Sequence, residues 1–206
     1  MESSKVQGIT KLTIALTAVC MGTAFILGGL NFFTRDKIDE QRRLKTIRSL
    51  KSVLPPTNND IVSDFVEIDG GKDQKGNPVK TILYRGKMDG QLVGTAFSVV
   101  AHDGYSGDIY LMIGVAPDRT ITGVEIIAHK ETPGLGDKIG KESWRGEFKG
   151  KAIESKTAIG SSFLDVKKDG GGIDQFSGAT ISPRAVVKAV KAGLKIYESA
   201  ASRVAS

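Results

Sequence analysis

The strongest hydrophobic pattern in the sequence is an uncharged run close to the N-terminus. Between Leu12 and Thr34 the thiol of Cys20 is the only ionisable side chain. At about 1.5 Å per residue, a helix of this length crosses a hydrocarbon layer of about 30 Å. Secretory signal segments have shorter apolar cores and a cleavage site of small residues. The pattern therefore predicts a retained signal anchor at 12–34 behind a short tail at 1–11. A buried core helix is the alternative, and the length of the run disfavours it.

A charged segment with helical spacing follows the apolar run. Its aliphatic residues recur every three or four positions: Leu44, Ile47, Leu50 and Leu54. Pro55 and Pro56 end this pattern, because proline lacks an amide hydrogen and disfavours helix in the residue before it. We expect a linker helix at 35–54 and a folded domain at 55–206. Two interpretations of the linker stay open: an amphipathic helix that joins anchor to domain, and a solvated charged helix without a partner.

Short apolar runs separated by turn-forming sequences begin near residue 60. Five of them have the length and composition of strands: 64–68, 81–85, 92–100, 109–115 and 121–128. The connections are short and rich in Gly, Asp, Asn and Pro, which favour turns. Consecutive strands with short links predict a largely antiparallel sheet.

The helical period returns in the C-terminal part. Residues 142–148 predict a short helix with Trp144 and Phe148 one turn apart. The last helix is predicted to have Ser182 as its N-cap and Pro183 at its first position, where the missing amide hydrogen costs nothing. Its apolar face consists of Val186 or Val187, Val190, Leu194 and Tyr197. Strands followed by helices predict an α+β domain, with a mainly antiparallel sheet and flanking helices, behind a single transmembrane helix.

Composition narrows the chemistry that this chain can perform. The formal net charge is +6, but Lys and Arg are scattered, which disfavours nucleic acid as a partner. A single cysteine cannot form an intramolecular disulfide, a redox pair or a cysteine-ligated iron–sulfur cluster. His102 and His129 lie far apart in the sequence, so a metal site is disfavoured as well. A redox function would therefore require an organic cofactor.

The loop before the last helix carries the most distinctive chemistry. Residues 174–183 read D-Q-F-S-G-A-T-I-S-P. Gly178 and Ala179 add no bulky side chains to the loop, and Thr180 presents a hydroxyl just before the predicted helix. The free amide hydrogens and the dipole of a first helical turn favour a negative charge such as a phosphate. On local physics alone, an ordinary helix cap explains the same residues more simply.

Two motifs resemble those of a known family of flavoproteins. Residues 174–180 read D-Q-F-S-G-A-T, which matches the sequence D-x-x-S-G-A-[ST], where a flavin transferase attaches FMN through its phosphate. Residues 129–136 read H-K-E-T-P-G-L-G. With the apolar anchor and the strands ahead of them, the chain resembles the G subunit of the Rnf electron transport complex. It is also similar to the C subunit of the Na⁺-translocating NADH:quinone reductase.

The resemblance implies which residues hold the cofactor. It places a covalent FMN phosphoester on Thr180. The loop beside the phosphate would consist of Ser177, Gly178 and Ala179. The flavin would be lined by residues of the upstream motif: Glu131, Thr132, Gly134, Leu135 and Gly136. Asp174 would help the transferase to recognise the site, although a solvated carboxylate in a polar loop explains the same residue. Without the resemblance, residues 129–136 would be a plain glycine-containing turn.

Three further features near these motifs are candidates for contact with the flavin, and two of them have a second interpretation. Trp144 stacks near the flavin ring or belongs to the core, and the core is the commoner place for a tryptophan one turn from a phenylalanine. Tyr105, in the sequence G-Y-S-G, reaches the site or forms a turn. The three glycines and the isoleucine at 170–173 would let the chain pass close to the ring.

The resemblance implies an electron-carrying component of a membrane-bound, ion-translocating complex. In Rnf-type complexes, electrons flow between ferredoxin and NAD⁺ while Na⁺ or H⁺ crosses the membrane. No G-x-G-x-x-G follows a strand, so direct NADH oxidation by this chain is disfavoured. The expected partners are other integral membrane and redox subunits and a flavin transferase, and no complete activity is expected of the chain alone.

Two indications of membrane topology disagree. Only Lys5 and Lys11 precede the apolar run, whereas seven Lys and Arg residues follow it between 35 and 51, so a literal positive-inside count places the domain in the cytoplasm. The resemblance implies the periplasmic side of the inner membrane. Because charges ahead of a long translocated domain count less than charges in short loops, we expect the periplasmic side.

Three other functions stay open at this point. The first is the C subunit of the quinone reductase, which the short chain disfavours because that protein is usually longer. The second is a membrane-anchored adaptor without a cofactor, in which S-G-A-T is only a helix cap. The third is a flavoprotein reductase that acts alone.

Overall fold

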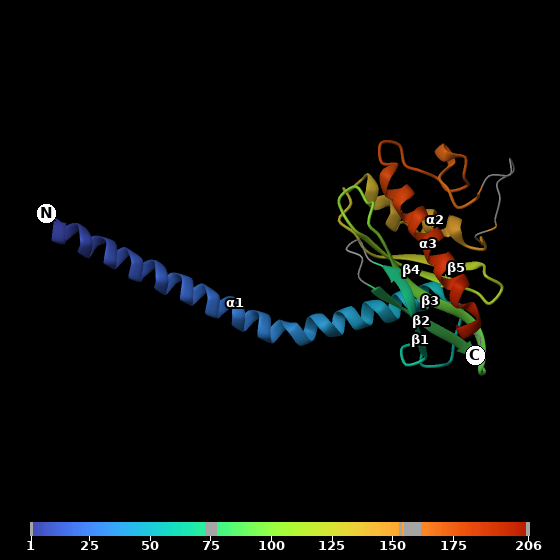
Figure 1. Cartoon of the computed structure of the whole chain (residues 1–206), viewed down its shortest axis with the longest axis horizontal. Coiled ribbons are helices and arrows are strands. Elements are labelled where there is room, and N and C mark those ends of the chain that lie inside the picture. Colours follow the sequence, from blue (N-terminus) through green and yellow to red (C-terminus); the bar gives the residue numbers. More distant parts are fainter. Residues whose placement is uncertain (1, 73–77, 153, 155–161, 205–206) are drawn as a thin grey trace. The chain divides into compact units, whose positions relative to one another are not determined.

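The chain divides into two compact units, Met1–Lys45 and Thr46–Ser206. The computed structural model describes residues 2–72, 78–152, 154 and 162–204. Helix α1 (Glu2–Val53) runs through the first unit and contributes its last turns to the second (Figure 1). Within the described residues, no helix combines the length and the hydropathy of a membrane span. Several side chains of the segment 12–34 lie outside the described residues, and the anchor stays a prediction.

The second unit contains one five-stranded sheet whose spatial order follows the sequence. Its strands are β1 (Phe65–Lys72), β2 (Pro78–Met88), β3 (Gln91–Ala101), β4 (Ile109–Val115) and β5 (Ile121–Ala128). Every neighbouring pair is antiparallel. The predicted antiparallel sheet is therefore confirmed, and β4 and β5 have the predicted bounds.

The hairpin of β1 and β2 extends further than its apolar residues indicate. The sequence predicted strands at 64–68 and 81–85, but β1 continues to Lys72, which pairs with Pro78. That boundary was wrong because backbone hydrogen bonds hold a ladder together whether its side chains are apolar or polar. The next connection is short, as predicted, and closes a hairpin through Asp89 and Gly90. Their φ angles of 51° and 79° match the two left-handed residues of a type I′ turn.

Helix α3 (Ile181–Val204) covers one face of the sheet, over β3 and β4 (Figure 1). The apolar face predicted for this helix is buried, and the ring of Tyr197 stacks on Phe97 of β3 at a centroid distance of 6.0 Å. The short helix predicted at 142–148 is present as α2 (Glu142–Arg145) and a tighter turn, η2 (Gly146–Phe148). It adds Trp144 and Phe148 to the same core. Burying each such side chain stabilises the fold by about 1.5–3 kcal/mol.

The opposite face of the sheet is covered by the end of α1. Leu50 and Val53 are 1% exposed and pack with Met112 of β4. The helix end approaches this closely because β4 has a glycine beneath it, and a Cβ at Gly114 would overlap the carbonyl oxygen of Val53. The hydroxyl of Thr122 in β5 donates to the same oxygen. The last turn of α1 is therefore part of the domain core.

Gly114→Ala is expected to destabilise the domain. The added methyl group meets backbone atoms of Val53, which cannot move aside as the end of a flexible side chain would, so we expect a loss of about 1–3 kcal/mol. Gly146→Ala is the matched control, because Gly146 has a helical φ of −60° and nothing lies within 4 Å of the added methyl group. Denaturant unfolding measures both variants. Equal stability of the two would contradict the close approach of α1 to β4.

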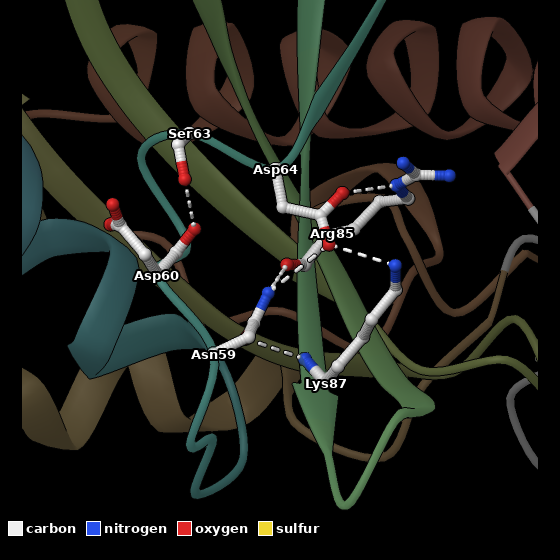
Figure 2. A network of polar contacts seen from close by, with 6 residues as sticks. All are labelled: Asn59, Asp60, Ser63, Asp64, Arg85 and Lys87. Carbon is white, nitrogen blue, oxygen red and sulfur yellow. Dashed lines mark hydrogen bonds and ion pairs between the residues drawn. The ribbon is translucent and has the colours of Figure 1, made fainter.

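A polar network fastens the segment between α1 and β1 to strand β2 (Figure 2). The carboxylate of Asp64 accepts a hydrogen bond from Nε of Arg85 at 2.6 Å and lies 2.8 Å from Nζ of Lys87. The side-chain amide of Asn59 donates to the carbonyl oxygen of Arg85, and its oxygen accepts from the amide of Lys87. Burial alone would raise the pKa of Asp64, but the hydrogen bonds and charges of Lys87 and Arg85 outweigh it. The pKa therefore lies below its ordinary value.

This network predicts a contribution to stability that disappears in acid. Because the pKa of Asp64 is lower in the folded chain, its contribution is complete above the unfolded value of about 3.9 and is lost as the pH falls through the folded value. Asp64→Asn should therefore cost about 1–3 kcal/mol at pH 7 and less at pH 3. Glu67→Gln is the control, because its ion pair with Lys80 is exposed and contributes only about 0–1 kcal/mol. Urea unfolding at both pH values is the measurement, and a loss independent of pH would contradict the assignment.

Candidate functional site

A cavity of about 250 Å³ lies beside the start of α3 and joins three segments that are distant in the sequence. They are the loop after β3, the loop after β5 and the stretch that leads into α3. The lining residues are Tyr105, Glu131, Thr132, Leu135, Gly136, Gly178, Ala179, Thr180, Ile181 and Ser182. The two sequence motifs therefore meet in one place.

A larger groove of about 430 Å³ runs along α3 but contains none of the motif residues. Three of its four cationic side chains are paired with neighbouring carboxylates: Arg184 with Asp169, Lys188 with Asp103, and Lys191 with Asp165. Because these three pairs offset their own charges, Lys195 remains as the main attraction for an anionic ligand, and a single exposed lysine attracts an anion only weakly. The smaller cavity, where the motifs converge, is the candidate site.

Most of the residues that the sequence proposed for the site line this cavity. They are Glu131, Thr132, Leu135, Gly136, Gly178, Ala179 and Thr180. Three others do not line it: Ser177, Gly134 and Asp174. Ser177 and Gly134 are exposed on the adjoining turns. Asp174 is exposed and forms an ion pair with Lys167. The lining thus consists of Tyr105, of four residues of the upstream motif (Glu131, Thr132, Leu135 and Gly136) and of residues 178–182.

A tight turn brings Thr180 to the cavity. The amide of Ala179 donates to the carbonyl oxygen of Phe176 at 3.0 Å, which closes a four-residue turn. Gly178 occupies the third position with a φ of 76°, in the left-handed region that a type II turn requires there. A side chain at this position would strain the backbone. The turn therefore explains why the motif has a glycine here.

The structure corrects the predicted start of α3. The sequence indicated Ser182 as the N-cap and Pro183 as the first helical residue, but α3 begins at Ile181. The carbonyl oxygen of Thr180 accepts the first backbone hydrogen bond of the helix, at 3.2 Å, so Thr180 is the N-cap. Pro183 still lies within the first turn, where an amide has no intrahelical acceptor. The prediction was wrong because the hydroxyl of Ser182 forms a tertiary hydrogen bond with Glu131 and does not cap the helix.

Glu131 joins the three segments of the site. Its side chain is 5% exposed; Oε2 accepts a hydrogen bond from the hydroxyl of Ser182 at 2.6 Å, and Oε1 accepts from the amide of Ser106 at 3.1 Å. Gly136 lies against the same carboxylate, and a Cβ there would be 2.6 Å from Oε2. A buried carboxylate needs such donors, because burying it without them is costly. Sequence reasoning missed this role, since Glu131 and Ser182 are 51 residues apart and no local pattern connects them.

The start of α3 is electrostatically open to an anion. The helix has no acidic residue in its first turn, and the first amide groups of any helix lack intrahelical acceptors. The helix dipole adds a partial positive charge at the same end. Thr180 is half-buried at this end and lines the cavity. The arrangement can hold a phosphate at or beside Thr180.

Trp144 belongs to the core and does not line the cavity. It is 3% exposed, its ring lies 5.6 Å from that of Phe176, and its Nε1 donates to the carbonyl oxygen of Asp174 at 2.7 Å. Glu147 accepts a hydrogen bond from the amide of Asp174, and burial raises the pKa of Glu147 above its ordinary value. These contacts support the turn that carries Thr180.

The stretch 170–173 also lies outside the cavity lining. Gly171 lies directly against the backbone of Asp165, and Ile173 is fully buried in the core. These residues pack the chain around the short turn η3 (Lys167–Asp169). Tyr105, by contrast, lines the cavity, as one of its two interpretations required.

Comparisons with known proteins identify the type of domain. Residues 104–195 match the family of FMN-binding domains, a range that contains both motifs and the whole cavity lining. The chain is 39% identical over 170 residues to the G subunit of the ion-translocating oxidoreductase complex of Aliivibrio fischeri strain ES114, and the match covers 81% of this chain and 79% of that protein. It is 40% identical over 192 residues to the G subunit of the same complex in Haemophilus influenzae strain PittEE, and the match covers 89% of each chain.

Two solved structures share the fold. The crystal structure of Shewanella oneidensis NqrC superposes with a TM-score of 0.51 at 24% identity and covers 74% of this chain and 69% of that one. The C subunit of the Na⁺-translocating NADH-quinone reductase of Parabacteroides distasonis gives a TM-score of 0.51 at 20% identity, covering 84% of this chain and 94% of that one. At these identities the likeness concerns the fold alone.

Proposed function

Because the chain belongs to the family of G subunits of ion-translocating, Rnf-type oxidoreductase complexes and contains an FMN-binding domain, we propose that it relays electrons through an FMN esterified to Thr180. The complex would transfer electrons between ferredoxin and NAD⁺ while ions cross the membrane. The observation that carries the proposal is the convergence of both motifs on one cavity beside the start of α3.

The surroundings of the three hydroxyls near the turn favour Thr180 as the attachment site. Ser182 is 1% exposed and already donates to Glu131. Ser177 is exposed and does not line the cavity. Thr180 lines the cavity at the N-cap of α3. A phosphate ester on its hydroxyl would therefore lie where the amides of the first turn and the helix dipole favour negative charge.

The residues of the cavity would position the flavin and shield it from water. Bound FMN supplies reversible one-electron and two-electron chemistry. The turn that ends at Ala179 holds the ester, and Glu131 fixes the upstream motif to α3 through Ser182. Thr132 supplies a hydroxyl donor for a polar edge of the ring, and Leu135 supplies apolar cover. The covalent tie keeps the cofactor in a site that is open to redox partners.

Asp174 is assigned to recognition by a flavin transferase. Its carboxylate is exposed and does not line the cavity, so it has no contact through which to hold the flavin. Its backbone is held by Trp144 and Glu147, which keeps the side chain on the surface at the start of the motif. An exposed, positioned carboxylate is available to an enzyme that modifies Thr180.

The membrane part of the proposal rests on α1. Residues 12–34 would span the inner membrane, residues 35–54 would form the linker, and the FMN domain at 55–206 would lie on the periplasmic side. Large apolar side chains of α1 are between 61% and 84% exposed: Ile14, Leu16, Val19, Met21, Phe25, Ile26 and Leu27. Side chains of this kind around a helix require lipid or protein surroundings. The partners are other integral membrane and redox subunits of the complex.

Mass spectrometry of protein from native membranes tests the cofactor. The peptide that contains Thr180 is expected to carry one FMN, joined as a phosphoester. An unmodified peptide would overturn the proposal and favour an adaptor without cofactor. Copurification with several integral membrane subunits is also expected, and its absence would favour a reductase that acts alone. The C subunit of the quinone reductase is disfavoured, because the relatives at 39% and 40% identity are G subunits of the ion-translocating complex.

A further inference from the structure

The mouth of the cavity has an exposed apolar rim. Three large side chains that line the cavity are strongly exposed: Tyr105 at 69%, Ile181 at 48% and Leu135 at 43%. The cavity, at about 250 Å³, is smaller than the range of about 300–1,000 Å³ in which proteins enclose ligands of this size. A flavin tethered at Thr180 would therefore not be wholly enclosed. Part of its ring system would have to lie against the rim.

The loop that carries Tyr105 is held in place although its aromatic ring is exposed. The amide of Ser106 donates to the buried carboxylate of Glu131 at 3.1 Å. At the ends of the loop, Nδ1 of His102 lies 2.9 Å from Oδ1 of Asp108, and Asp103 forms an ion pair with Lys188 of α3. Gly104 lets the chain turn tightly, because a Cβ there would overlap the carbonyl oxygen of Gly107. The ring is therefore presented by a fixed backbone.

On the basis of the proposed covalent FMN, we infer that Tyr105 stacks on the isoalloxazine ring and shields it from solvent. The part of the chain that the structure describes offers Tyr105 no aromatic partner, in contrast to Trp144 and Tyr197. A planar ligand would bury this ring favourably, since aromatic rings gain from offset stacking in addition to the area they bury. Because the loop is already fixed, little conformational entropy is lost when the ring is covered. Tyr105 would thereby set how far the flavin is accessible to small solutes.

Collisional quenching of flavin fluorescence by iodide tests this inference. The full chain, coexpressed with a flavin transferase and purified in detergent, is compared with Tyr105→Ala and Tyr105→Phe. The bimolecular quenching constant, which is the Stern–Volmer constant divided by the fluorescence lifetime of each variant, is expected to rise by about two- to tenfold in the alanine variant. A stacking free energy of about 0.5–1.5 kcal/mol between two aromatic rings corresponds to this ratio of open to stacked populations. The phenylalanine variant keeps the ring and should quench as the wild type does. Tyr110→Ala is the matched control, because Tyr110 is 45% exposed on β4 and does not line the cavity.

The outcomes separate this inference from the proposed function. The mass of the Thr180 peptide is measured in every sample and reports attachment independently of ring exposure. If Tyr105→Ala carries FMN but quenches as the wild type does, Tyr105 does not cover the ring, and the covalent FMN stands. If Tyr105→Phe quenches as strongly as the alanine variant, the stacking role is also wrong. A wild-type peptide without FMN would overturn the proposed function itself.

Discussion

Thr180→Ala is expected to give a folded protein with no covalent flavin. The substitution removes a hydroxyl that both lines the cavity and stands at the start of α3, while the hydroxyl of Ser182 is committed to Glu131. It also removes the N-cap side chain, which should cost about 0.5–2 kcal/mol and leave the domain folded. The denatured protein is run on a gel under ultraviolet light after coexpression with a flavin transferase. Fluorescence of the band should fall to the background.

Two conservative variants control for this result. Thr180→Ser keeps a hydroxyl and the motif D-x-x-S-G-A-[ST], so it should retain the fluorescent band. Ser177→Ala removes a neighbouring hydroxyl that is exposed and outside the cavity lining, and the FMN should remain on Thr180. A fluorescent Thr180→Ala band, with the FMN found on Ser177 or Ser182, would refute the assignment of the attachment site.

Glu131→Ala is expected to have the largest effect on stability. It leaves the buried hydroxyl of Ser182 and the amide of Ser106 without their acceptor, and a hydrogen bond to a charged group contributes about 1.5–3 kcal/mol. We expect a total loss of about 2–5 kcal/mol and a fall in the melting temperature of roughly 10 °C. The three segments of the site would also lose their common partner, so FMN attachment at Thr180 should slow. Thermal unfolding and the rate of FMN incorporation measure the two effects.

Glu131→Gln is the matched variant for this prediction. Glutamine has nearly the same volume but only one acceptor oxygen, so it can serve Ser182 or Ser106 but not both. We expect about half of the loss seen for alanine, because one of the two donors stays unpaired. Wild-type stability in Glu131→Ala would mean that the carboxylate does not hold the site together.

Much of the fold follows from local patterns along the chain. The apolar runs at β4 and β5 have the period and composition of strands, and their apolar side chains pack in the core as expected. The turn at Asp89 and Gly90 could be predicted because few residues tolerate two successive left-handed conformations. The apolar face of α3 could also be predicted, because its spacing of three and four residues matches the helical period.

The candidate site was only partly readable from the sequence. Gly178 could be recognised because a left-handed turn residue leaves a local signature. The predicted start of α3 was wrong. Local preference favours Ser182 as the N-cap, but in the folded chain the hydroxyl of Ser182 donates to Glu131. Tyr105 had two interpretations from the sequence, and the position of the loop after β3 at the cavity distinguishes them.

The sequence by itself determined the order and type of the strands and helices, though not all of their bounds, because these choices depend mainly on neighbours a few residues apart. Only the tertiary structure decided that residues 129–136, Tyr105 and the start of α3 share one cavity, and that Glu131 links them. The physical reason is that a buried carboxylate takes its donors from whichever segments pack around it. Those segments come together through the sheet and α3, and their separation along the chain carries no local signal. The close approach of α1 to Gly114 is another contact of this kind.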